Sequence, residues 1–138
     1  MSSPSVGFMD AVKKAFAGYC DYASRSRRSE YWFFALFDFL VIVVVSLIFG
    51  AIFALIGIGQ VVPAIVAIVE LVLFFGFMLP LSVRRLHDTG KSGWFILLGL
   101  IPFVGGIILL IFFCMDSQPE TNEYGPSPKY SGSPGNVI

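Results

Sequence analysis

Hydrophobic residues occur in four blocks along the chain, and polar stretches separate the blocks. In the first block, residues 8–24, apolar side chains recur at helical spacing, while Asp10, Lys13 and Lys14 occupy the other face. This pattern predicts an amphipathic helix that lies in a membrane interface, because the helix is too polar to cross a bilayer. The same helix could also pack on the rest of the protein as a cap.

The other three blocks, residues 32–58, 61–83 and 94–115, are long enough to enter a membrane. About 20 apolar residues cross a hydrocarbon core of about 30 Å, so the first two blocks predict transmembrane helices. The third block contains Pro102 and the pair Gly105-Gly106 near its middle. We expect a kinked third span, and the alternative is a re-entrant pair of short half-helices.

The expected fold class is therefore an all-α integral membrane protein, with an N-terminal interfacial helix and three transmembrane helices, the third kinked or re-entrant. Residues 1–128 are expected to form a single membrane domain. Residues 116–138 are rich in Pro, Ser and Gly, which predicts a flexible tail with little regular structure.

Composition supports the membrane assignment. Of the 138 residues, 57% are hydrophobic and only 13% are charged, with a mean hydropathy of +0.84, whereas about 25% of residues are charged in soluble domains. Nine Lys and Arg balance nine Asp and Glu, so no overall field favours nucleic acid, and we expect no nucleic-acid partner. Cys20, Cys114 and the single histidine do not predict a disulfide framework, a metal site or a cofactor.

The distribution of basic residues predicts the orientation of the spans. Lys and Arg precede the first span and follow the second, but the loop between these two spans contains none. By the positive-inside rule, the N-terminus and residues 84–91 face the cytoplasm. A full third span would place the C-terminus outside, and a re-entrant segment would place it inside.

Three polar clusters flank the apolar blocks in a fixed order: RSRRSEYW at residues 25–32, RRLHDTGKSGW at residues 84–94, and NEYGPSP at residues 122–128. Together they resemble the DUF805 family of small bacterial inner-membrane proteins over roughly residues 8–128. The chain departs from the family's usual residues at Ser24, Glu123 and Ser127. The resemblance implies a multi-pass protein of the bacterial inner (cytoplasmic) membrane, and it implies no activity and no catalytic residues.

The basic clusters have two interpretations. They can act as topology and anchoring signals, with Tyr31, Trp32 and Trp94 as an interfacial aromatic belt. Alternatively, Glu30 and Asp88 pair with some of the arginines and leave a pocket for an anionic lipid headgroup or a phosphate. The candidate residues for that binding site are Arg27, Arg28, Glu30, Arg84, Arg85, His87, Asp88 and Lys91.

Two acidic residues fall inside the predicted spans. Glu70 lies 13 residues before Val83, about 20 Å from the cytoplasmic end of the second span, close to the midplane. A carboxyl group there is costly, so it marks a functional candidate unless it bonds to Ser46, Gln60 or a backbone carbonyl as packing glue. Asp38 lies closer to the interface and is expected to reach the cytoplasmic arginines.

These patterns predict a structural or interaction protein that packs with itself or with a larger membrane partner, and no enzyme. Gly50, Ala51, Ala54 and Gly57 line one side of the first span with small residues, which suits close helix packing. Two alternatives remain: a small transporter or ion-conducting oligomer that uses Glu70, and a protein that binds anionic lipid through the arginine clusters.

Overall fold

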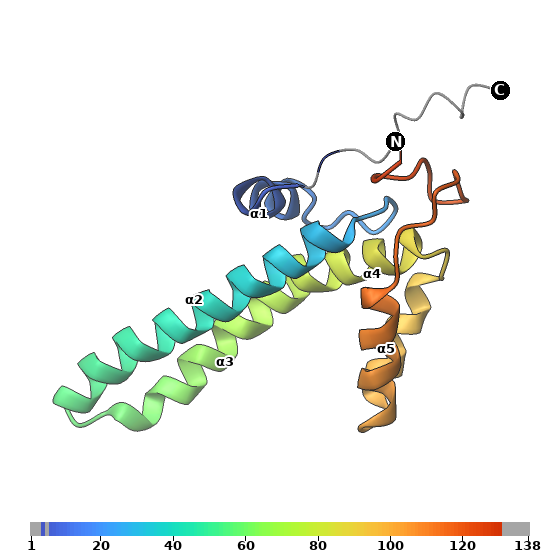
Figure 1. The fold of residues 1–138 in the computed structure, drawn as a ribbon. Coiled ribbons are helices and arrows are strands. Elements are labelled where there is room, and N and C mark those ends of the chain that lie inside the picture. The colour runs from blue at the N-terminus through green and yellow to red at the C-terminus, as the bar shows by residue number, and fades with distance from the viewer. Residues whose placement is uncertain (1–3, 5, 131–138) are drawn as a thin grey trace.

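The structure is a computed structural model that describes residue 4 and residues 6–130. Within these residues all regular structure is helical, apart from one isolated bridge between Asn122 and Gly125. Figure 1 shows two helical hairpins that diverge from a common end, with a short helix packed beside that end. The all-helical class is therefore confirmed.

The first hairpin consists of two long apolar helical runs. Helix α2 spans Arg28–Leu55, and a turn with Gly57 at φ +74° leads to η1 (Gly59–Val61) and α3 (Val62–Leu73). The helix continues without a break through the π-helical turn η2 (Phe74–Met78) into α4 (Leu79–Asp88). Both runs, Arg28–Leu55 and Gly59–Asp88, are long and apolar enough to cross a membrane. Each extends four or five residues further into its polar cluster than the apolar pattern predicted.

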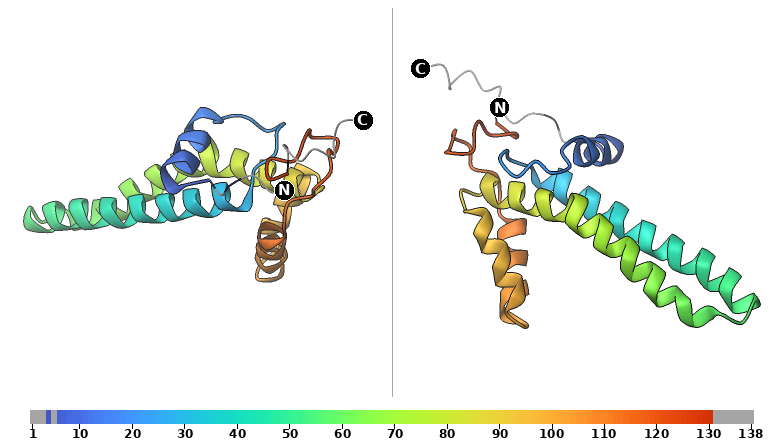
Figure 2. Two further views of the ribbon diagram at one scale, coloured as in Figure 1. Left: turned by 45° about the horizontal axis from the view of Figure 1, so that its top comes forward. Right: turned by 180° about the vertical axis from the view of Figure 1, so that it is seen from behind.

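Residues 94–115 form a second hairpin instead of the kinked span that we expected. Helix η3, a 3-10 helix, spans Gly93–Leu100, and α5 spans Val104–Cys114 beside it. Each helix is only about 16 Å long, too short to cross the hydrocarbon core. The chain reverses at Phe103, whose φ is +62°, and Gly105 lies so close to the carbonyl of Leu98 that any Cβ would overlap it. The chain therefore leads away from the end of α4 along η3 and returns along α5, so that the end of α5 lies near the end of α4 (Figure 2).

Helix α1 covers the common end of the hairpins. It spans Phe8–Ala17, shorter than the predicted 8–24, because Gly18 caps it and Cys20 adopts φ +60°. Its buried face packs on α2, and the ring of Phe16 makes edge contacts with Phe34 and Phe77. Helix α1 therefore packs on the protein's own helices, which is one of the two interpretations of this segment. Its location in a membrane interface stays a prediction.

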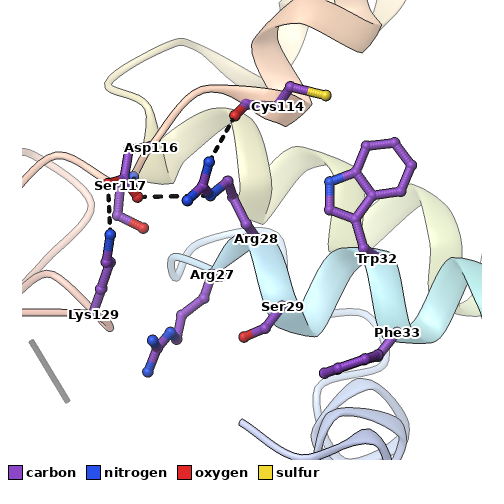
Figure 3. Close-up of a pocket in the computed structure, with 9 residues that line it drawn as sticks. All are labelled: Arg27, Arg28, Ser29, Trp32, Phe33, Cys114, Asp116, Ser117 and Lys129. Carbon is purple, nitrogen blue, oxygen red and sulfur yellow. Dashed lines mark hydrogen bonds and ion pairs between the residues drawn. The ribbon is translucent and has the colours of Figure 1, made fainter. Parts of the chain in front are cut away.

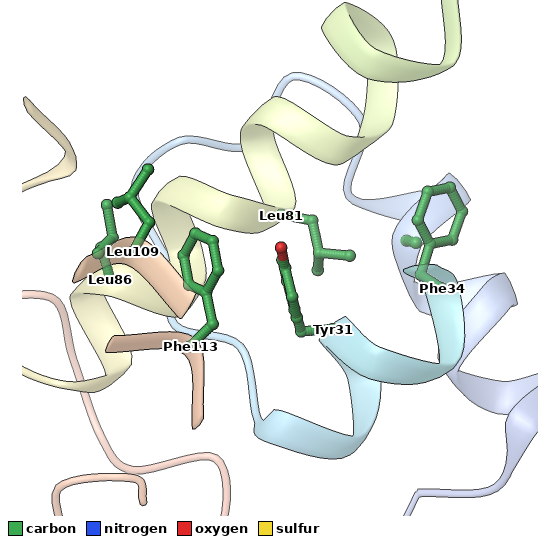
Figure 4. Packing of buried hydrophobic residues seen from close by; sticks show 7 residues of the cluster. Tyr31, Phe34, Leu81, Leu86, Leu109 and Phe113 are labelled. Carbon is green, nitrogen blue, oxygen red and sulfur yellow. The ribbon is translucent and has the colours of Figure 1, made fainter. Parts of the chain in front are cut away.

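The hydrophobic core lies where the helices converge. Figure 4 shows Tyr31 and Phe34 of α2 beside Leu81 of α4 and Phe113 of α5. In contrast, side chains along the far halves of α2 and α3 are largely exposed, including Leu47 at 67% and Leu55 at 88%. Exposed apolar faces of this kind suit contact with lipid or with another membrane helix. The fold therefore fixes one end of the molecule tightly, and the polar clusters lie at that end.

Candidate functional site

The three polar clusters of the sequence meet in one place. The loop before α2, the end of α4 and the chain after α5 pack together at the common end of the hairpins (Figure 1). No helix or strand forms within the described residues 116–130, and hydrogen bonds hold this segment against the other two. Residues 131–138 of the predicted tail lie outside the described residues.

The loop before α2, the end of α4 and the described chain after α5 together form a structure that we call the polar cap. Asp88 lies at its centre. Its side chain is fully buried at the end of α4 and lies between two guanidinium groups. The Nε of Arg25 donates to Oδ1 at 3.1 Å, and the Nη1 of Arg85 donates to Oδ2 at 2.5 Å. The hydroxyl of Ser117 donates to Oδ2 as well. Asp88 thus pairs with two arginines, of which Arg85 was among the candidate residues and Arg25 was not.

Arg25 ties the chain after α5 to the end of α4. Its guanidinium donates to the backbone oxygens of Gln118 (2.7 Å), Glu120 (2.9 Å) and Gly125 (3.1 Å), in addition to Asp88. Five donors in a fixed planar fork make such multiple capture possible. The side chain is 1% exposed. The sequence places Arg25 in the RSRRSEYW cluster, but nothing local distinguishes it from the neighbouring arginines.

Arg85 binds backbone carbonyls at the C-terminal end of α5. Its Nε donates to the carbonyl of Phe113 at 3.2 Å, and its Nη2 donates to the carbonyl of Met115. These carbonyls lack partners inside the helix because they lie at its C-terminal end. A buried cation there also suits the negative end of the helix dipole. Arg85 therefore fixes the return of the second hairpin.

Glu30 and Arg84 bind partners other than each other. Glu30 accepts from the Nζ of Lys14 on α1 at 2.9 Å and from the hydroxyl of Ser26 at 2.8 Å, so it pairs with a lysine rather than an arginine. Arg84 lies 3.9 Å from Asp21, yet its Nε and Nη2 are buried without a hydrogen-bond partner. Both residues attach α1 and the following loop to the cap.

His87 and Lys91 also make structural contacts. The His87 ring stacks on Tyr124 with 3.7 Å between centroids, and its Nδ1 lies 3.3 Å from the carbonyl of Ser24. Both contacts of His87 join the end of α4 to other parts of the chain, the loop before α2 and the chain after α5. Lys91 lies over the Phe112 ring at 4.6 Å. Burial and the charge of Arg85 lower the pKa of Lys91.

Carboxyl groups at the edge of the cap are held in their charged form. The ammonium of Lys129 hydrogen-bonds Asp116, and it holds the pKa of that carboxyl below its usual value despite partial burial. Burial alone would raise the pKa of Asp21, but the Ser24 hydroxyl, the N–H groups of Ala23 and Ser24 and the charge of Arg84 outweigh it and lower the pKa. These ion pairs close the outer rim of the cap.

A cavity of about 450 Å³ opens beside the cap at the first two turns of α2. Figure 3 shows Arg27, Arg28 and Ser29 on one side, Trp32 and Phe33 on a second, and the chain leaving α5 opposite. Of the predicted anion-binding residues, only Arg27 and Arg28 line this cavity. The other six belong to the contacts described above.

Among the described residues, the two acidic side chains in the apolar parts of the first hairpin, Asp38 and Glu70, form no ion pair with an arginine or lysine. Glu70 is exposed on α3 and makes no hydrogen bond to Ser46 or Gln60. Asp38 does not reach the arginines, and its Oδ1 is buried without a hydrogen-bond partner. The hydrogen bonds that we expected for these two carboxyl groups are therefore not formed, although the two groups lie close enough for the charge of Asp38 to act on Glu70.

The predicted aromatic belt divides in two. Trp32 and Trp94 are 41% and 78% exposed, which suits interfacial anchors, but Tyr31 is 7% exposed and belongs to the core. Cys20 and Cys114 are free and exposed. Within the described part of the chain, no group of three His, Cys, Asp or Glu side chains could hold a metal ion.

Comparison with known proteins gives the family. The family model described as "Protein of unknown function (DUF805)" matches residues 19–126, a region that contains the first two polar clusters and most of the third. The chain belongs to the DUF805 family. The chain is also 36% identical to the inner membrane protein YhaI of Escherichia coli K12 over 115 residues, which cover 83% of this chain and 92% of YhaI. It is 34% identical to the inner membrane protein YhaH over 122 residues, or 88% of this chain and 98% of YhaH.

No solved structure matches the chain. The family resemblance read from the clusters is confirmed, and with it the small bacterial inner membrane protein of unknown function. The three clusters on which the resemblance rests pack together in the polar cap, so they have a common structural role. Neither the family name nor the relatives' names assign an activity to any residue in it.

Proposed function

We propose that this DUF805 protein is an interaction protein of the inner membrane that associates with a second copy of itself through α3. The observation that carries the proposal is the exposure of Glu70 on an otherwise apolar helix. Glu70 lies near the middle of the Gly59–Asp88 run, and a carboxyl group facing lipid at that depth costs several kcal/mol if it is ionised. Association that covers Glu70 removes this cost.

The surface around Glu70 favours a helix as its cover. Pro63 and Ala67 of α3 and Phe74, the first residue of η2, lie at helical spacing on the same side as Glu70, and all of them are exposed. Ala67, one turn before Glu70, lets a second backbone approach closely, so that the carboxyl group can bond across the interface. The second copy offers the same carboxyl and the same small residue, which satisfies a two-fold arrangement.

Association in liposomes tests the proposal. The fraction of dimer is measured by energy transfer between two labelled populations of the full chain as the protein-to-lipid ratio is raised. Interhelical hydrogen bonds contribute about 0.6 to 1.7 kcal/mol, so we expect Glu70→Leu to weaken association about 3-fold to 20-fold. Val72→Leu, at an exposed apolar position of the same helix, is the matched control and should leave association unchanged. Monomers at every ratio, or equal association of both variants, would contradict the proposal.

An ion-conducting oligomer is the second candidate, and Glu70 is again the residue that favours it. Two long helices per chain cannot enclose a pore, so conduction requires several copies with Glu70 facing the pathway. Ion flux through liposomes that wild type supports and Glu70→Gln abolishes, at equal association, would select the conducting oligomer over a purely structural one.

A further inference from the structure

The cavity at the start of α2 carries more positive than negative charge. Arg27, Arg28 and Lys129 line it, and Asp116 is the single acidic group among the lining residues. Asp116 binds Lys129 at 2.5 Å and lies 3.7 Å from the Nε of Arg28. Asp116 therefore contacts two of these cations, while the Nη1 of Arg27 donates to the carbonyl of Pro4 at 2.7 Å. Cationic side chains outnumber the carboxylate among the lining residues, which favours an anion in the cavity.

Arg28 has a donor available for such an anion. Its Nη1 donates to the carbonyl of Cys114 at 3.2 Å, and its Nε faces Asp116. The remaining nitrogen, Nη2, is not used by these contacts, and the side chain is 47% exposed. In Figure 3 this guanidinium lies between Ser117 and Cys114 at the edge of the cavity.

The beginning of α2 supplies further donors. No side chain caps this helix, so the N–H groups of its first turn have no partner within it. The Oγ of Ser29 is buried and has no hydrogen-bond partner. A buried hydroxyl without a partner is uncommon and calls for an explanation. A phosphate oxygen at the helix start would accept from both, and the helix dipole favours negative charge there.

The third side of the cavity is aromatic. Trp32 and Phe33 follow one turn further along α2, at the point where the helix becomes apolar. The cavity is therefore cationic at one end and apolar at the other, and the apolar end faces the part of α2 that enters the membrane. A free phosphate uses only the first of these features, whereas a lipid uses both.

We propose that this cavity binds the phosphate group of an anionic glycerophospholipid, with the first turn of α2 and Arg28 on the phosphate and Trp32 against the glycerol and acyl carbons. This site adjoins the buried Asp88 network through Ser117, which lines the cavity and donates to Asp88. Glu70 is not among the lining residues, so the site does not depend on self-association.

The test uses Trp32 as its own reporter. In a Trp94→Phe background Trp32 is the single tryptophan of the full chain, because the sequence contains two. Its fluorescence is followed in nonionic detergent during titration with dihexanoyl phosphatidylglycerol, dihexanoyl phosphatidylcholine or inorganic phosphate. We expect saturable binding of the phosphatidylglycerol and at least tenfold weaker binding of the phosphatidylcholine.

Two variants locate the site. Arg28→Gln should weaken phosphatidylglycerol binding about tenfold, since it removes a charge-assisted hydrogen bond. Lys13→Gln removes the same charge from an exposed position outside the cavity and should change nothing. Ser29→Ala, a smaller change that keeps every charge, should weaken binding several-fold and guards against a folding defect in Arg28→Gln.

Three results would overturn the proposal. Equal binding of the two lipids would remove the charge argument, and equal weakening by Arg28→Gln and Lys13→Gln would remove the cavity. Inorganic phosphate that binds as tightly as phosphatidylglycerol, and competes with it, would assign the site to free phosphate instead of a lipid.

Discussion

Replacing Asp88 with asparagine should release the chain after α5 from the cap. Asparagine keeps the size of the side chain but removes the negative charge that faces Arg25 and Arg85, both of which are buried. Removal of one partner from a buried ion pair costs about 3 to 5 kcal/mol, because the other charge is left uncompensated in a poorly solvated site. Two guanidinium groups lose their partner here, so the upper part of this range is expected.

Hydrogen exchange measures this release directly. The amide of Gln118 donates to the Asp88 carbonyl at 3.0 Å, and the amides of Asn122 and Gly125 donate to each other's carbonyls. Since about 1.4 kcal/mol changes an equilibrium tenfold, a loss of about 4 kcal/mol should speed exchange at these amides about 1,000-fold, while amides in the middle of α2 keep their rates.

Asp116→Asn provides the control for this experiment. Asp116 also pairs with Arg28 and Lys129, but it is 46% exposed, and exposed pairs contribute at most about 1 kcal/mol. Exchange at Gln118 should therefore change by less than tenfold in this variant. A similar small change in Asp88→Asn would refute the assignment of Asp88 as the group that holds the cap together.

Three further predictions follow from particular contacts. Gly105→Ala should destabilise the second hairpin by about 1 to 3 kcal/mol because its Cβ overlaps the Leu98 carbonyl, whereas Gly106→Ala, with open space at its Cβ, should be neutral or stabilising in denaturant titrations in detergent. Lys129 lowers the pKa of Asp116, so this ion pair should be intact above pH 4 and should be lost only as the pH falls through the lowered pKa. NMR of the carboxyl group should show a titration midpoint below the usual value near 3.9. Lys129→Gln should move this midpoint upward. Topology reporters fused before Phe8 and after Tyr130 should be active on the same side of the membrane, and opposite sides would contradict the turn at Phe103.

The hydrophobic pattern was sufficient for the class of fold but not for the third apolar block. Residues 94–115 are long enough to cross a membrane, and neither Pro102 nor the glycine pair decides between a kink and a reversal. The deciding contacts are between residues on different helices, such as Gly105 against the Leu98 carbonyl and Arg85 on the carbonyls at the end of α5. Such contacts depend on the folded chain and leave no periodic signal.

The candidate site, too, could be predicted only in part from the sequence. The sequence identified the arginine clusters and Asp88, because charged residues beside apolar spans are conspicuous. It did not separate Arg25, which is buried and binds the chain about 100 residues away, from Arg28, which is half exposed and lines the cavity. Arg25 and Arg28 belong to the same basic cluster of the sequence, whereas in the folded protein one side chain is buried and the other is half exposed.

The buried charges of the cap are best understood as a device for specificity. Between helices in a bilayer there is little hydrophobic driving force, since lipid tails are as apolar as leucine side chains. The apolar faces of α2, α3, η3 and α5 therefore do not by themselves fix which helices are neighbours. Asp88 can be satisfied only when the loop containing Arg25, the helix containing Arg85 and the chain containing Ser117 arrive together. That requirement selects the returned hairpin over a third span, because a third span would carry Ser117 to the opposite side of the membrane and leave Asp88 with one partner fewer.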